Sequence, residues 1–385
     1  MKKYINLHLV DANVDSFGDL WVNEEGKIEK IVLRSSIRKE SEEGDFDGWG
    51  LTCMPSFIDL HGHFREPGQE RKETIQSGIQ SAAKGGFGLV VAMANTTPIC
   101  DEAELIQANQ EKARRLGQAE YLQVSALTIG FGESPVDYTA IRPLTRLFSN
   151  DGKPIDRPSV MVKALEDSLK HDFLLMVHQE PEEEMIRRDL LLAEAVGGNL
   201  HICHVSTKES VDLIRSAKKR GVKVTCEVTP HHLYCANETY RVNPPFGTEV
   251  DRQALMDGLK DGSIDCVATD HAPHTEEDKA AGSPGITGYD AAFSLVRTAL
   301  PDASLCEISK WMSANPAAIL GADRRNAEGR LEVGKEANFV FLRPDQPRIL
   351  NTFYSKSDNT PFVGDKVLGV IEQTIRKGER IDENA

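Results

Sequence analysis

Short runs of apolar, often β-branched residues alternate with longer helical patterns from about residue 51 to about residue 300. Clear examples of the apolar runs are 88–94 (GLVVAMA), 173–177 (FLLMV) and 222–228 (VKVTCEV). Such nearly continuous apolar runs are typical of parallel strands that are covered on both faces. The predicted strands end near His61, Asn95, Ile129, Ser149, His178, His204, Thr229 and Asp270.

Helical patterns fill the intervals between these strands. The segments 73–84, 101–116 and 207–220 are each followed by glycine, which is common directly after the last residue of a helix. Ser206, followed three residues later by Glu209, predicts a capping box at the start of the third segment. Eight strands that alternate with helices favour a (β/α)8 barrel of the TIM type.

The two ends of the chain have a different pattern. Residues 1 to about 50 and about 328 to 385 show short strand patterns, clearest at 337–342 and 369–375. Neither end is long enough to bury a core by itself, so we expect them to pair into one small β-sandwich domain. The predicted domains are a barrel over 54–325 and a small β-domain made of 1–53 and 326–385.

The composition narrows the class of protein. Of the 385 residues, 40% are hydrophobic and 27% charged, as in ordinary globular proteins. The net charge of −15 argues against binding to nucleic acid, whose backbone is also negative. Seven scattered cysteines favour a reducing compartment. The sequence shows neither a signal peptide nor an apolar run long enough to span a membrane, and we expect a cytoplasmic protein.

The strongest chemical signal is the segment 59–65 (DLHGHFR), which directly follows the apolar run 54–58. Residues two apart in an extended segment point to the same side, so His61 and His63 can bind one metal ion together. Gly62 between them leaves room for close approach. A single His-x-His can also arise by chance, and the other strand ends decide between the two readings.

Further metal-ligand residue types stand at the ends of later predicted strands. Because the carboxyl ends of barrel strands meet at one rim, where active sites lie, these side chains should gather there. Histidine and carboxylate ligands suit zinc, with manganese, iron or cobalt as alternatives, and their number suggests two ions bridged by a carboxylate and a hydroxide. The expected rim residues are His178, His204, His231 and His232, together with Asp151 and Asp270. His201 stands three residues before His204 and is expected to face away from it.

Nearly the whole chain resembles the dihydroorotases of the amidohydrolase superfamily. The matching stretches that the superfamily shares carry the His-x-His motif and the scattered ligands. Two stretches narrow the match to dihydroorotases: Arg-Glu-Pro-Gly at 65–68 and Asn-Thr-Pro-Phe at 359–362. The remaining matches are 93–96 (MANT), 148–152 (FSNDG), 204–207 (HVST), 227–232 (EVTPHH), 243–245 (NPP) and 268–274 (ATDHAPH).

The resemblance implies a role for each matching position. His61 and His63 would bind the first metal, His178 and His204 the second, and Asp151 would bridge them. Asp270 would bind the first metal and shuttle the catalytic proton. The implied substrate-binding residues, with Arg65 holding a carboxylate through its bidentate guanidinium, are His63, Arg65, Asn95, Asn243, His274, Pro284 and Gly285. His231 and His232 are not implied as ligands.

The resemblance also implies the reaction. It is the reversible cyclisation of N-carbamoyl-L-aspartate to L-dihydroorotate, with loss of water, in pyrimidine biosynthesis. In the hydrolytic direction, a hydroxide bridging two zinc ions attacks the ring carbonyl, and Asp270 passes the proton to the leaving nitrogen. A homodimer and an association with aspartate transcarbamoylase are the implied partners.

Two alternatives remain open from the sequence. One is a hydantoinase, dihydropyrimidinase or allantoinase on the same barrel, although those enzymes generally use a carboxylated lysine as the bridge and lack Arg65 in this context. The other is a metal-free scaffold for aspartate transcarbamoylase, which would have lost ligands from the set. The chain departs from the resembled family mainly by a shortened stretch between His178 and His204.

Overall fold

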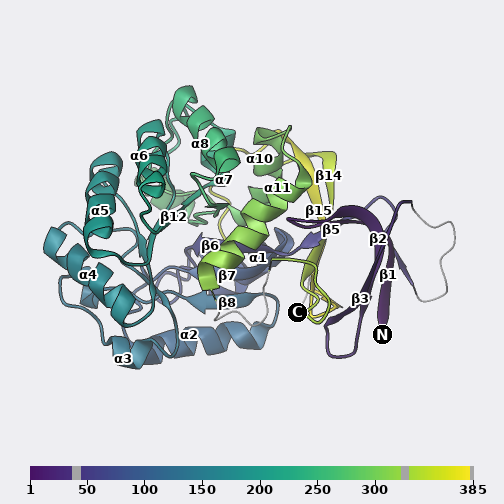
Figure 1. Cartoon of the computed structure of the whole chain (residues 1–385), viewed down its shortest axis with the longest axis horizontal. Coiled ribbons are helices and arrows are strands. Elements are labelled where there is room, and N and C mark those ends of the chain that lie inside the picture. Colours follow the sequence, from purple (N-terminus) through teal and green to yellow (C-terminus); the bar gives the residue numbers. More distant parts are fainter. Residues whose placement is uncertain (37–44, 322–328, 382–385) are drawn as a thin grey trace.

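The computed structural model describes residues 1–36, 45–321 and 329–381. Within them, parallel strands surround a common axis and helices cover the outside (Figure 1), which confirms the predicted barrel. The apolar run at 88–94 shows why these residues form a barrel strand: the strand that contains it, 87–92, is buried along its whole length between its neighbours and the covering helices. The barrel strands are β6 (Phe57–Gly62), β7 (Phe87–Ala92), β8 (Glu120–Gln123), β9 (Leu147–Ser149), β10 (Leu174–Val177), β11 (Leu200–Ile202), β12 (Val224–Val228) and β13 (Cys266–Val267).

Hydrogen bonds join these strands into two parallel sheets, β6-β7-β8 and β9-β10-β11-β12-β13. Single bridges link the sheets at both edges. Ser125, just past β8, pairs with Phe148 of β9, and His271, just past β13, pairs with Gly62 of β6. At the second seam, Asp59 also accepts hydrogen bonds from the backbone N–H and the hydroxyl of Thr269, at 2.6 and 2.8 Å. The strands therefore form a ring.

Long helices follow most barrel strands, and three of them lie where the sequence predicts. The segments 73–84, 101–116 and 207–220 become α1, α2 and α6. The helices are α1 (Ile75–Lys84), α2 (Ala103–Leu116), α3 (Tyr138–Ile141), α4 (Pro158–Lys170), α5 (Glu182–Val196), α6 (Lys208–Lys219), α7 (Pro230–Tyr234), α8 (Glu249–Asp261), α9 (Glu276–Ala280), α10 (Ala292–Ala299), α11 (Leu305–Ser309) and α12 (Asn315–Leu320). Short helical turns are η1 (Ile129–Phe131), η2 (Tyr289–Ala291) and η3 (Lys310–Ala314).

Two local predictions are wrong. The residue that caps α6 is Thr207, whose side chain accepts from the N–H of Ser210, because the hydroxyl of Ser206 is already bonded to Glu182. The third barrel strand ends at Gln123 and not near Ile129, which lies in the turn η1. A helical turn with Gly130 at φ +59° cannot continue a strand, although its apolar residues resemble one.

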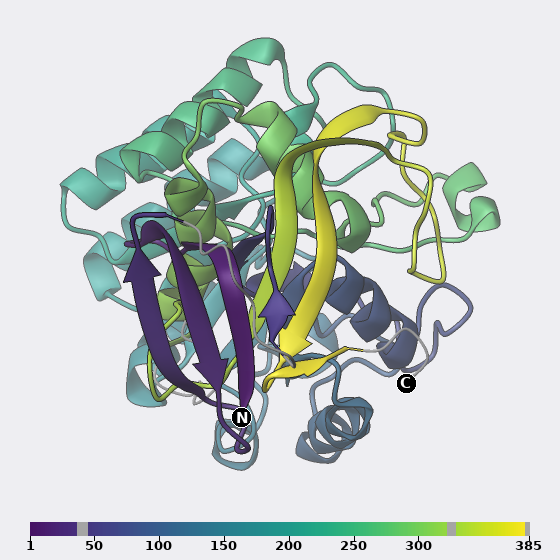
Figure 2. The same ribbon diagram turned by 90° about the vertical axis from the view of Figure 1, so that its right-hand side faces the viewer.

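Both ends of the chain form one small β-domain, as predicted. Its strands make a single mixed sheet in the order β16-β15-β14-β5-β1-β2-β3, with β4 also paired to β1 (Figure 2). They are β1 (Lys2–Val10), β2 (Asp15–Val22), β3 (Ile28–Arg34), β4 (Phe46–Asp47), β5 (Thr52–Pro55), β14 (Phe339–Ile349), β15 (Lys366–Arg376) and β16 (Glu379–Arg380). The predicted boundary at 53–54 falls inside β5, and the boundary at 325–326 lies outside the described residues.

The small domain has a hydrophobic cluster of its own, while other residues of its strands, such as Val10 and Val340, belong to the barrel core. Residues from both chain ends share the core of the small domain, including Leu7, Leu20 and Phe339.

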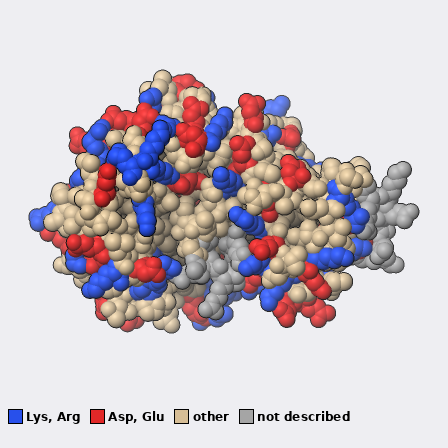
Figure 3. Space-filling view, viewed as in Figure 1, with Lys and Arg blue, Asp and Glu red and all other residues tan. Residues whose placement is uncertain are grey.

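On the face shown in Figure 3, acidic and basic side chains are interspersed over the barrel helices. None of the helices in the described part of the chain combines the length and the apolar character needed to cross a membrane.

Candidate metal centre

Six buried side chains meet at the carboxyl ends of the barrel strands. His61 lies in β6 and His63 just after it, and the other four lie within three residues of the ends of β9, β10, β11 and β13. They form two groups whose potential ligand atoms lie within 4.8 Å of one another, namely His61, His63 and Asp270, and Asp151, His178 and His204. The structure thus brings together all six residues proposed as metal ligands from the sequence.

Asp151 lies between the two groups. Its Oδ1 is 3.4 Å from Nε2 of His61 and 3.5 Å from Nε2 of His204. Its Oδ2 is 3.5 Å from Nε2 of His63. One carboxylate that faces histidines of both groups has the position needed to bridge two ions.

The other ligand atoms face the same spaces. Oδ1 of Asp270 lies 3.1 Å from Nε2 of His63 and 3.7 Å from Nε2 of His61. Nδ1 of His178 lies 3.0 Å from Nε2 of His204 and 3.7 Å from Oδ1 of Asp151. Nitrogen lone pairs directed at one another and at a carboxylate suit a cation between them.

Two buried atoms of this cluster have no hydrogen-bond partner among the described residues, Nε2 of His61 and Oδ1 of Asp151. A buried polar atom without a partner costs free energy, so these atoms call for a ligand. Burial raises the pKa of the Asp151 carboxyl, but the neighbouring His61 and His204 outweigh it and hold that pKa well below its usual range. The residues present therefore fit metal ions, with an ionised carboxylate at the centre.

Two further groups of potential ligands include Cys203, one with His61 and Asp151 and one with His201 and Glu227. Burial raises the pKa of the Cys203 thiol, so the sulfur stays protonated at neutral pH. Glu227 and His201 are also engaged with each other, at 3.0 Å. The two groups without cysteine are the better metal sites.

Glu227 and His201 belong to the site in another way. Nδ1 of His61 donates to Oε1 of Glu227 at 2.7 Å, while Oε2 of Glu227 contacts Nε2 of His201. This directs Nε2 of His61 toward Asp151. The expectation that His201 faces away from the site is wrong, since the closed barrel turns this side chain inward toward β12. The sequence does contain one indication of this role, because Glu227 is a carboxylate inside the otherwise mostly apolar run 222–228.

We expect Glu227→Gln to weaken metal binding while the fold is kept. The amide has the shape of the carboxylate but lacks its charge, so His61 loses the group that fixes its tautomer and raises its basicity. Affinity for the first metal should fall about 10- to 100-fold. Competition with a chromophoric chelator measures this. Asp167→Asn, a buried acid paired with Lys163 on α4, is the control and should bind metal normally; equal affinities in all three proteins would refute the role of Glu227.

Three site residues have left-handed backbone conformations that side chains rarely adopt. They are Arg65 at φ +59°, His204 at φ +35° and Asp270 at φ +45°. Such strain concentrates at functional sites. Gly62 is required for a different reason, since a Cβ there would lie 2.2 Å from the hydroxyl oxygen of Tyr289.

Arg65 is buried beside the first metal group. Its Nε donates to the carbonyl of Pro273 at 3.2 Å, and its Nη2 lies 3.1 Å from Nε2 of His274. Among the described residues, no carboxylate lies within ion-pair distance of this guanidinium. Burial lowers the pKa of Arg65 to about 10, which leaves it charged at neutral pH. A buried cation without an anion is suited to a carboxylate ligand.

Other residues predicted to bind substrate surround the same rim. Oδ1 of Asn95 lies 2.9 Å from Nδ1 of His63, so Asn95 orients that ring. Nδ2 of Asn243 lies 3.4 Å from Nε2 of His178 and donates to Glu180 at 3.2 Å. Asn95 therefore contacts a histidine of the first metal group, and Asn243 contacts a histidine of the second.

His274 and Gly285 are joined by a residue that the sequence analysis did not assign. The side chain of Asn359 accepts from the N–H of His274 at 2.8 Å and donates to the carbonyl of Gly285 at 3.0 Å. Asn359 is the first residue of the Asn-Thr-Pro-Phe stretch. Pro284, directly before Gly285, is half-buried. His231 and His232 are buried near this rim but lie outside both metal groups.

The comparisons with known proteins agree with this geometry. The model of the family described as "Amidohydrolase family" matches residues 52–381. A protein of Clostridium botulinum named dihydroorotase is 36% identical over 97% of both chains. Proteins of the same name from Geobacillus kaustophilus and Bacillus caldolyticus are each 37% identical over 89% of both chains.

Solved structures show the same fold at lower sequence identity. An L-hydantoinase from Arthrobacter aurescens aligns with a TM-score of 0.87 and 21% identity over 98% of this chain and 95% of its own. A D-hydantoinase from Thermus sp. aligns with a TM-score of 0.85 and 20% identity, over 99% and 95%. Together with the family match and the relatives named dihydroorotase, this shows that the chain belongs to the amidohydrolase family and, within it, to the dihydroorotases.

Proposed function

We propose that this chain is a metal-dependent dihydroorotase, which interconverts N-carbamoyl-L-aspartate and L-dihydroorotate in pyrimidine biosynthesis. The observation that carries the proposal is the buried, charged Arg65 beside a cluster that fits two metal ions. The cluster supplies the means to open a cyclic amide, and Arg65 selects a ring that bears a carboxylate. Four histidines and two carboxylates favour zinc, two ions per subunit.

Each residue has a task in this reaction. His61, His63 and Asp270 would hold one ion, His178 and His204 the other, with Asp151 shared between them. When bound, the ions would polarise the ring carbonyl and lower the pKa of a water molecule toward neutrality. Arg65 and His274 would hold the substrate carboxylate at the other side of the ring.

Asp270 would move the proton. Burial raises the pKa of its carboxyl, but the hydrogen bond with His63 and the charge of His61 outweigh this and keep the pKa below its usual range. An ionised carboxylate can accept a proton from the attacking water and return it to the leaving ring nitrogen. In the direction of ring closure the same group would work in reverse.

The test is a substrate comparison with the purified chain. We expect two metal ions per subunit, and turnover of dihydroorotate well above that of hydantoin and dihydrouracil. Turnover of hydantoin alone would instead identify a hydantoinase, and absence of both metal and turnover would identify the non-catalytic scaffold. Two observations speak against these alternatives: the sequence has no lysine between Lys112 and Lys153 to bridge the metals, and all six ligands are present.

We expect Arg65→Lys to impair recognition of the substrate and leave the metals in place. Lysine keeps the positive charge but loses the fork that binds both carboxylate oxygens. A charged hydrogen bond contributes about 1.5–3 kcal/mol, so kcat/KM should fall about 10- to 100-fold, mainly through KM. The control is Arg71→Lys, an exposed arginine paired with Asp278. Wild-type KM in Arg65→Lys would contradict carboxylate binding there.

The location and the protein partners of this chain are also part of its proposed function. We infer a cytoplasmic homodimer that can associate with aspartate transcarbamoylase, as the resemblance to dihydroorotases implies. Light scattering of the purified chain, alone and mixed with aspartate transcarbamoylase, tests both contacts. A monomeric mass for the chain alone would overturn the homodimer. If the mixture contains no species larger than its separate components, the association with aspartate transcarbamoylase is overturned.

A further inference from the structure

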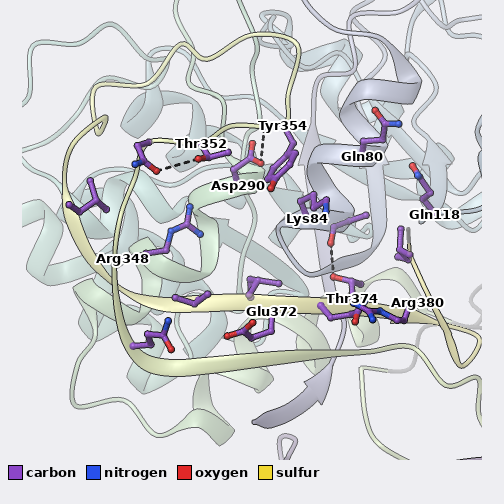
Figure 4. Close-up of a pocket in the computed structure, with 18 of the residues that line it drawn as sticks. Gln80, Lys84, Gln118, Asp290, Arg348, Thr352, Tyr354, Glu372, Thr374 and Arg380 are labelled. Atoms are coloured by element: carbon purple, nitrogen blue, oxygen red, sulfur yellow. Dashed lines mark hydrogen bonds between the residues drawn. The ribbon is translucent and has the colours of Figure 1, made fainter. Parts of the chain in front are cut away.

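A second cavity, of about 550 Å³, lies between the barrel and the long strands of the small domain (Figure 4). Its walls come from α1, from β14 and β15, and from the loop that follows β14. None of the six proposed metal ligands lines it. Lys84, in the last turn of α1, stands in its wall, and α1 runs back from the rim that carries the metal ligands. The cavity is therefore separate from the metal centre.

One positive side chain of this cavity, that of Arg348, forms no ion pair with the acids of the lining. Arg348 of β14 has no hydrogen-bond or ion-pair partner among the described residues, and burial lowers its pKa. In Figure 4 its side chain extends from the strand into the space below Thr352 and Asp290. Lys84 lies with its Nζ 5.0 Å from the ring centre of Tyr354.

The two acids that line the cavity are already engaged elsewhere. Asp290 accepts from the N–H of Tyr354 at 3.0 Å and from the hydroxyl of Ser81 at 2.8 Å. Burial raises its pKa, and its carboxyl also interacts electrostatically with Arg348. Glu372 is paired with Arg343 at 2.7 Å. The lining thus holds the basic residues Lys84, Arg348 and Arg380 against these two acids, in a chain whose total charge is −15.

The rest of the lining is rich in neutral polar groups. Amide side chains such as Gln80 and Asn351 and hydroxyl side chains such as Thr352 and Thr374 also line it. Such groups would bind hydroxyls and amides of a ligand better than an apolar body. The volume is within the range of pockets that take a small molecule.

We propose that this cavity binds a small polar metabolite with a phosphate or carboxylate group, and that Arg348 pairs with that anion. A guanidinium binds either group through two parallel hydrogen bonds. Lys84 lies in the part of the wall that α1 forms. The proposal does not depend on the reaction at the metal centre, because the two sites share no residue.

Calorimetric titration of the metal-loaded protein tests this, with ribose 5-phosphate and citrate as probes of the two anion classes. We expect one of them to bind, and Arg348→Gln to weaken that binding about 10- to 100-fold, the effect of one charged hydrogen bond. Arg297→Gln is the control, because Arg297 is paired with Asp345 outside the cavity, and this variant should bind normally.

The outcomes are distinct. Tighter binding of ribose 5-phosphate identifies a phosphate site, and tighter binding of citrate identifies a carboxylate site. Binding that survives Arg348→Gln unchanged would come from the metal centre and overturn the proposal. So would the absence of binding by either probe at millimolar concentration, or equal losses in the two arginine variants. Melting curves of both variants check that the fold is intact.

Discussion

Replacing Asp151 with alanine is expected to empty the metal centre and remove almost all turnover. Among the described residues, Asp151 is the carboxylate whose oxygens face histidines of both groups, at 3.4 to 3.7 Å. Without it, four neutral histidines and Asp270 must hold two divalent ions without a shared anion. Since bound ions contribute several kcal/mol to transition-state stabilisation, the rate should fall roughly a thousandfold or more.

Metal per subunit and dihydroorotate hydrolysis, measured on the same preparation, test this expectation. Asp156→Ala is the control, because Asp156 is an exposed acid in the same loop. It should retain both metal and activity. An Asp151→Ala protein that holds two ions and turns over at the wild-type rate would show that the bridge is another group. Its melting temperature, measured beside that of the metal-stripped wild type, separates loss of metal from loss of fold.

The second large effect is expected for Asp270→Asn. The amide oxygen can still face the first metal, but it cannot accept a proton at neutral pH. General acid–base catalysis typically contributes about 10²- to 10⁴-fold, and kcat should fall by this amount. Metal content should fall less than in Asp151→Ala, because the ligand position keeps an oxygen.

The decisive comparison is between rate and metal content in that variant. Asp257→Asn, on the exposed face of α8, serves as the control and should match the wild type. A wild-type kcat in Asp270→Asn would refute the proton-shuttle role. A loss of rate that excess metal fully restores would show that Asp270 acts only as a ligand.

The metal ligands could be predicted from the sequence because two simple regularities place them. Alternation along a strand puts His61 and His63 on one side, and parallel strands end at one rim. These rules need only the strand ends, which the apolar runs mark well. His178 directly follows such a run, His204 and Asp270 come two and three residues after their strands, and the structure brings all three to one rim.

The supporting residues could not be predicted in the same way. Glu227 and His201 contact His61 across the barrel interior, and this depends on the register between β11 and β12, which no local pattern encodes. The cap of α6 depends on a distant residue too, since Glu182 takes the hydroxyl of Ser206. Contacts between segments far apart in the chain decide each of these details.

The contact between β6, the first barrel strand, and the segment after β13, the last one, suggests that the metal centre also stabilises the barrel. In the part of the chain that the structure describes, one bridge, between Gly62 and His271, joins the backbones of β6 and the segment after β13. The proposed ligands of the first ion stand on both sides of this seam, His61 and His63 on one and Asp270 on the other. An ion bound there would cross-link the first barrel strand to the segment that follows the last one. Loading of the first metal would then be the closing step of folding, and a chain starved of metal would be an easier substrate for proteases.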